Sequence, residues 1–218
     1  MLLINFFVEN LVENQILKMK NKPSSFINFA LTNKTESMAI LGTLLKRKLS
    51  DDQVSNVFIN ALFDVVDNGF TEVSELINED IAFVHSPNIE PNLNGEFALI
   101  VIAANLSSLE STFDADQAVR VEQMIFEKLG KIYSMSTAEF QTLAREYQSF
   151  IARVNYPSKN LVYGMSKAMF EKYKLNDFQD DYFRRMQAPN PLFLKRMDEV
   201  MANFIWNWDA FFKKYKMN

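Results

Sequence analysis

The chain has 218 residues, of which 48% are hydrophobic, and its 20 phenylalanines and 11 methionines outnumber its five glycines. This composition excludes a wholly disordered chain and disfavours a β-sandwich, whose tight turns need glycine, so we expect a single helical domain over residues 1–218. The lack of cysteine excludes disulfides and thiolate metal sites, and the net charge of −4 conceals a strong separation of acidic from basic residues.

The N-terminal sequence MLLINFFVENLVENQ lacks the basic start, the longer apolar stretch and the small-residue cleavage site of a secretory signal. The longest apolar run, 97–104, is eight residues, whereas a transmembrane helix needs about 20. We therefore expect a soluble, cytoplasmic protein that has no membrane partner.

Helix starts are indicated by polar residues that cap the first turn of a helix. Ser50 and Gln53, and likewise Ser136 and Glu139, have the spacing of a capping box, and Asp114 marks a further start. Together with apolar residues at helical spacing, these signals predict eight or nine helices. The predicted ranges are 2–20, 24–48, 51–68, 71–84, 95–111, 115–133, 137–155, 159–174 and 177–216.

The segment EFALIVIAANL, 96–106, contains the one β-branched run that suggests a strand. A lone strand cannot satisfy its backbone hydrogen bonds, so we expect a central helix that is buried on every side. The predicted fold is therefore an all-α, single-domain multi-helix bundle. It has this buried helix and a long C-terminal helix over 177–216, interrupted at 189–191.

The stretch LFDVVDNGFTEVSEL, 62–76, resembles the calcium loop of the EF-hand family over 15 residues. It departs from that loop at Val66, where an oxygen ligand is missing, and at Thr71, where an apolar residue is usual. Gly69 matches the turn glycine. The resemblance implies a weak calcium site whose ligands are Asp64, Asn68, Glu72 and Glu75.

The same stretch is similar to the helix-turn-helix domain of tetracycline-repressor-type regulators, in which a helix ends in Gly-Phe-Thr. The next part of that family's domain carries basic residues into the major groove, but the corresponding segment here, FVHSPNIEPNLNGEF, has no Lys or Arg. We therefore expect no nucleic-acid binding. A third interpretation, which we prefer, needs no ligand: Asn68 and Gly69 end one helix, and Thr71 caps the next.

Between Lys48 and Arg120 lie 71 residues without Lys or Arg that contain 13 Asp or Glu, and we call this segment (49–119) the acidic block. The flanks, 1–48 and 120–218, carry 23 basic residues against 14 acidic ones. The block either docks onto the chain's own basic flanks or faces solvent and attracts a basic partner. The residues expected to contact such a partner are Asp64, Asp67, Glu72, Glu75, Glu79, Asp80 and Trp206.

Trp206 is included because of its place in the predicted C-terminal helix. The apolar residues of that helix form one broad stripe, and Trp206 projects from the opposite side, with Ala202 and Ala210 one turn away on either side. Small residues around a tryptophan suggest close approach by another helix or by a second subunit. A homodimer through the C-terminal helix is therefore one expected form of the protein.

His85 is the sole histidine, and the sequence has no Gly-x-Ser-x-Gly motif and no glycine-rich phosphate loop. We therefore predict no catalytic residues, no metal site and no cofactor. The leading hypothesis is a non-enzymatic helical binding protein that presents the acidic block to a basic partner. The first alternative is a helical carrier of an apolar small molecule or lipid. The second is an enzyme that uses His85.

Overall fold

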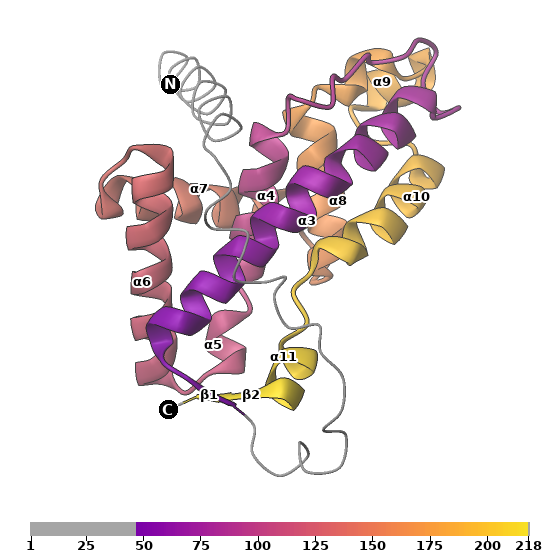
Figure 1. Cartoon of the computed structure of the whole chain (residues 1–218). Coiled ribbons are helices and arrows are strands. Elements are labelled where there is room, and N and C mark those ends of the chain that lie inside the picture. The colour runs from indigo at the N-terminus through magenta and orange to yellow at the C-terminus, as the bar shows by residue number, and fades with distance from the viewer. Residues whose placement is uncertain (1–46, 218) are drawn as a thin grey trace, which may run out of the picture.

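The structure, a computed structural model, describes residues 47–217 (Figure 1). The predicted helix 2–20 and nearly all of the predicted helix 24–48 lie outside the described residues. The longer helices are α3 (Asp51–Glu79), α4 (Gly95–Leu106), α6 (Ala115–Tyr133), α7 (Thr137–Asn155), α8 (Leu161–Lys172), α10 (Pro191–Met201) and α11 (Trp208–Lys214). The shorter helical segments are α5 (Leu109–Thr112), α9 (Asp181–Met186) and the 3-10 turns η1 (Leu175–Phe178) and η2 (Ala202–Phe204).

The all-α class is confirmed, although the helices within residues 47–217 do not correspond one to one with those predicted there. The boundaries of α6 and α7 match the predicted ranges to the residue. Local capping explains this agreement: Asp114 accepts the Gln117 N–H at 2.9 Å, and Ser136 forms a capping box with Glu139. Helix starts that depend on neighbouring residues can thus be predicted from the sequence.

α3 is one continuous helix of 29 residues, so the predicted division into helices 51–68 and 71–84 is wrong. Gly69 lies within the helix and does not end it. A Cβ atom at this position would lie 2.7 Å from Cε1 and Cζ of Phe204, so the glycine admits an aromatic ring against the middle of the helix. The glycine allows α3 and the distant segment around Phe204 to approach closely, and the sequence around Gly69 does not reveal this contact.

α4 is the predicted buried helix, and it packs against α3, α7 and α8. Every residue of α4 is buried except Glu96, which is half-buried. Because other helices surround α4, it carries apolar side chains around its whole circumference and shows no amphipathic pattern. Among the described residues, no helix is long and apolar enough to span a membrane.

The predicted long C-terminal helix is wrong, because the chain leaves the helical path between α10 and α11. Asn105 of α4 causes the break: its side chain donates to the Phe204 carbonyl at 2.8 Å and accepts the Trp206 N–H at 2.7 Å. Backbone groups of this turn therefore bond to a distant side chain. Asn207 then caps α11.

The C-terminal end returns to the start of the described chain. β2 (Tyr215–Met217) pairs in parallel with β1 (Arg47–Leu49), with Leu49 opposite Met217 (Figure 1). No strand is predicted at either place, because three residues are too few for a recognisable period and the pairing is non-local. Buried residues of the helices and of β1 form one hydrophobic cluster.

Candidate functional site

Five of the residues expected to contact a partner lie on one exposed side of α3, which we call the acidic face. Spacings of three to five residues confine them to about 140° of the helix circumference over a length of about 22 Å. The opposite side of the helix is apolar and packs into the core. The acidic face consists of Asp64, Asp67, Glu72, Glu75 and Glu79, all of them exposed.

Local contacts around the acidic face involve amides. The Asn68 side chain donates to the carbonyl of Asp64 at 2.8 Å and to its carboxylate at 3.0 Å. The Asn94 side chain donates to the Asp67 carboxylate at 3.2 Å. α3 itself contains neither Lys nor Arg, so no cation on the same helix offsets the charge of this face.

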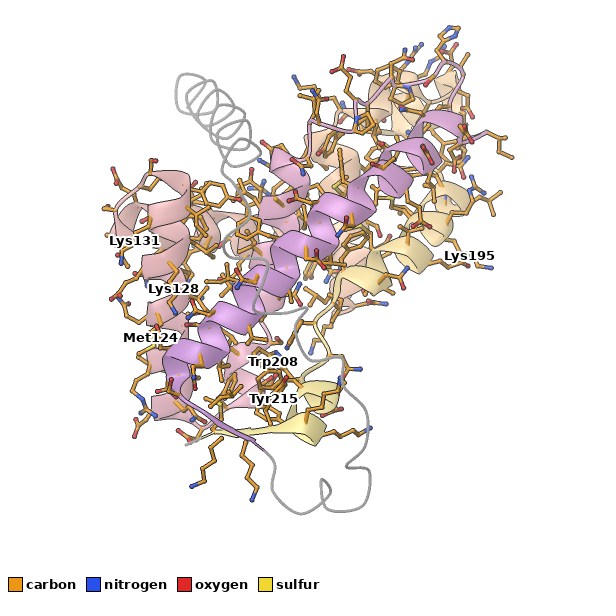
Figure 2. All side chains as sticks on the ribbon, viewed as in Figure 1. Met124, Lys128, Lys131, Lys195, Trp208 and Tyr215 are labelled. Carbon is orange, nitrogen blue, oxygen red and sulfur yellow. The ribbon has the colours of Figure 1, made fainter. Side chains whose placement is uncertain are left out.

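Other carboxylates of the acidic block pair with cations of the basic flank 120–218. Lys128, on α6 beside α3, donates to both the carboxylate and the carbonyl of Asp52 (Figure 2). The acidic block is therefore divided: part of it ties α3 and α4 to later helices, and the acidic face stays exposed. The four pairs within the described chain are Asp51–Arg120 (2.8 Å), Asp52–Lys128 (2.6 Å), Asp80–Arg196 (2.6 Å) and Glu96–Lys172 (3.0 Å).

Asp80 differs from its neighbours on the acidic face, although the sequence places it among the partner-contacting residues. Its side chain is 2% exposed and bonds through both carboxylate oxygens to the Arg196 guanidinium. Hydrogen bonding to this carboxylate raises the pKa of Arg196 above its ordinary value. Asp80 therefore joins the end of α3 to α10.

The calcium loop implied by the EF-hand resemblance is absent, because residues 62–76 are helical throughout. Thr71 is an exposed residue within α3 and does not cap a second helix. Carboxylates along one helix face point outward and cannot surround an ion as the ligands of a calcium loop do. Residues 47–217 hold no group of three or more His, Asp or Glu that could hold a metal ion.

Trp206 does not project from a continuous helix, because the chain is not helical at this position. Trp206 is half-buried, and the centroid of its ring lies 6.0 Å from that of Phe58 and 5.9 Å from that of Trp208. Trp208 and Tyr215 lie at the same end of the molecule (Figure 2). Phe58 precedes the acidic face, so the structure does not bring Trp206 onto that face. The helix expected to carry a homodimer contact is likewise interrupted.

His85 is exposed in the turn that follows α3, and no described side chain hydrogen-bonds to it. A general base needs an orienting partner, and the described residues provide none for His85. The enzyme hypothesis stays a prediction, as does the carrier hypothesis.

A half-buried polar network, which the sequence pattern does not predict, links α4, α7 and α8. The Tyr147 hydroxyl donates to the Glu96 carboxylate at 2.5 Å, and the Lys172 ammonium donates to the Tyr147 hydroxyl at 2.9 Å. Burial, reinforced by Glu96, raises the pKa of Tyr147 above its ordinary value. The phenol therefore stays protonated and acts as a donor. The sequence feature that could have indicated this network is Glu96, the lone charged residue in the apolar segment 96–106.

These features define an all-α protein whose candidate site is a charged helix face. No protein-family model matches the chain, and no curated protein and no solved structure matches it either.

Proposed function

We propose that this chain is a non-enzymatic binding module whose acidic face contacts a basic segment of a partner protein. The observation that supports the proposal is the exposure of five carboxylates along one side of a helix that lacks Lys and Arg. No ion pair with a described residue is formed by Asp64, Glu72, Glu75 and Glu79.

Helix stability does not explain this arrangement. Carboxylates three or four residues apart repel each other. Glu75 and Glu79 also lie near the C-terminal end of α3, where the helix dipole is negative, and the last turn of this helix contains no basic residue. A cationic partner would relieve both effects, so part of the binding free energy would come from repulsion that the free protein carries.

Surface ion pairs contribute little each, so binding requires several at once. We expect the affinity to depend on ionic strength, because the Debye length shortens from about 30 Å at 0.01 M salt to about 8 Å at 0.15 M. Long-range attraction would also speed association more than it slows dissociation.

The variant that combines Glu72→Gln, Glu75→Gln and Glu79→Gln tests the proposal. Binding of a fluorescent oligo-arginine peptide to the whole chain is measured by anisotropy at low and at physiological salt. We expect the variant to bind at least about ten-fold more weakly at low salt. We also expect the wild-type affinity to fall steeply as salt is added.

A matched control removes the same number of charges elsewhere. Glu127, Glu146 and Glu171 are exposed on α6, on α7 and in the last turn of α8. Their combined replacement by Gln should leave the affinity within about two-fold of wild type. Equal weakening by both triple variants would mean that the peptide senses only net charge, and the acidic face would then have no specific role.

A further inference from the structure

Large apolar side chains gather in exposed positions at one end of the molecule. Three segments meet there: the turn after α3, the helix α9 and the start of α10 (Figure 1). Of the nine exposed large hydrophobic residues among those described, five belong to these segments. We call this surface the apolar end: Ile81 (89% exposed), Val84 (59%), Tyr182 (66%), Met186 (58%) and Leu192 (63%).

Hydrogen bonds of one buried side chain join the chain before α9 to the start of α10, and a backbone bond attaches the turn after α3. Gln179, which is 1% exposed, donates to the Ala188 carbonyl at 2.9 Å and accepts the Asn190 N–H at 2.7 Å. The backbone N–H of Val84 donates to the Phe178 carbonyl at 2.8 Å next to it. Hydrogen bonds fix the backbone, so the apolar side chains are presented by an ordered surface. A partner that covers them meets a preformed surface and bears less ordering cost.

The rings beneath the apolar end reinforce this order. Phe83 packs on Phe193 with ring centroids 4.9 Å apart, and the Asp80–Arg196 ion pair lies one residue before Ile81. These contacts join the turn after α3 to α10. The exposed residues of the apolar end therefore lie on backbone segments that buried contacts hold in place.

Charges balance within one part of the apolar end. Residues 174–187, which include α9, contain three basic and three acidic residues. Arg184 forms an ion pair with Asp181, and Arg185 lies 4.0 Å from the same side chain. A ligand therefore meets no net charge from this part of the apolar end, and its contacts with the exposed side chains there are expected to be apolar.

The apolar end adjoins the acidic face at the end of α3, because Ile81 follows Glu79 by two residues. We infer that the two surfaces together bind one partner segment, which is basic along its length and carries large apolar side chains at one end. The inference rests on the proposed function and specifies its partner. An extended segment would cover the acidic face with about seven residues. Charge attraction brings such a segment in, and apolar anchors supply most of its affinity.

The test uses three labelled peptides of equal length and equal positive charge. One has a Leu-Phe-Leu sequence after its basic residues, one has it before them, and one has Ser in these three positions. Affinities for the whole chain are measured by anisotropy at physiological salt. We expect one of the apolar-ended peptides to bind at least about ten-fold more tightly than the Ser peptide.

The variant that combines Ile81→Ser, Val84→Ser and Leu192→Ser should abolish this preference and leave the affinity for the Ser peptide unchanged. All three side chains are exposed, so the fold should persist, and circular dichroism checks this. Val119→Ser is the matched control, since Val119 is 67% exposed on α6 and lies in another part of the chain. It should retain the preference.

The outcomes separate the two proposals. If all peptides bind alike, or if the triple variant keeps the preference, the role of the apolar end is wrong and the acidic face can still act alone. If no peptide binds, both proposals fail. If sedimentation shows wild-type dimers that the triple variant loses, the apolar end joins two copies of this chain, and the inference is overturned.

Discussion

The phenol of Tyr147 joins the carboxylate of Glu96 to the ammonium of Lys172, and the ammonium also lies 4.2 Å from the centre of the Tyr147 ring. Tyr147 thus donates one hydrogen bond, accepts another and forms a cation–π contact at the junction of α4, α7 and α8. Burial is the main cause that raises the pKa of Tyr147, and it acts in the same way on Tyr133 and Tyr173. All three phenols therefore stay neutral in the folded protein at a pH where an ordinary tyrosine begins to lose its proton.

We expect the free energy of unfolding to fall as the pH rises above about 10, the ordinary pKa of tyrosine. In this range the unfolded chain loses phenolic protons that the folded chain keeps, so alkali favours the unfolded state. Urea titrations from about pH 8 to pH 11 would measure the loss, and phenolate absorbance would report the titration. Tyr147→Phe should reduce the alkaline loss of stability.

An exposed tyrosine provides the control for this prediction. Tyr156 is 81% exposed, so Tyr156→Phe should leave the alkaline loss of stability unchanged. The prediction is wrong if all seven tyrosines of the folded protein titrate together near their ordinary pKa.

At the scale of the element, α3 combines a core-facing side with an exposed side on which five carboxylates gather. Val66, Phe70, Val73 and Ile77 are buried, and they alternate with the carboxylates of the acidic face. The apolar burial stabilises the helix, and the clustered carboxylates oppose it. A helix selected for stability alone would carry Lys or Arg in its last turn.

Removing charge from the end of α3 should therefore stabilise the protein. We expect the combined Glu75→Gln and Glu79→Gln substitutions to raise Tm by about 1 to 3 °C at low salt, because they remove two repulsive pairs, with Glu72 and with each other, and an unfavourable interaction with the helix dipole. Differential scanning calorimetry at low and high salt measures the effect, which should shrink as salt is added. A lower Tm at low salt would show that these carboxylates have stabilising partners.

At the scale of the whole molecule, Asn105 connects the buried helix α4 to the C-terminal part of the chain. Its side chain makes three hydrogen bonds, to the carbonyls of Val101 and Phe204 and from the N–H of Trp206. The aromatic cluster around Trp208 packs beyond this point, and β2 then pairs with β1. One buried amide therefore positions the return of the chain to its described start.

We expect Asn105→Ala to reduce the free energy of unfolding by about 2 to 4 kcal/mol, because two backbone groups lose a buried partner and a cavity remains. Urea denaturation followed by tryptophan fluorescence measures the change and also reports the surroundings of Trp206 and Trp208. Asn60→Ala is the control, since Asn60 is exposed on α3, and it should change stability by less than about 0.5 kcal/mol. If both substitutions lowered the free energy of unfolding equally, Asn105 would not have the structural role that its buried hydrogen bonds indicate.

Prediction from the sequence succeeds where the physical cause is local. The starts of α6 and α7 follow from side chains that cap a turn within three residues, and the burial of α4 follows from its uninterrupted apolar composition. The residues of the acidic face could be named, because the lack of Lys and Arg between 48 and 120 is a property of the sequence itself. That these residues share one exposed side depends on the continuity of α3.

Tertiary structure decides the remaining features. Gly69 has the usual sequence of a helix end, but it lies within α3, and Phe204, 135 positions later in the sequence, packs against it. The C-terminal helix is interrupted because Asn105, about 100 residues earlier, bonds to its backbone. By itself the sequence determined the all-α class, several helix ends and the separation of charge. Only the packed fold decided which carboxylates pair and which face solvent, because ion pairs and close contacts depend on residues that are distant in the sequence and adjacent in space.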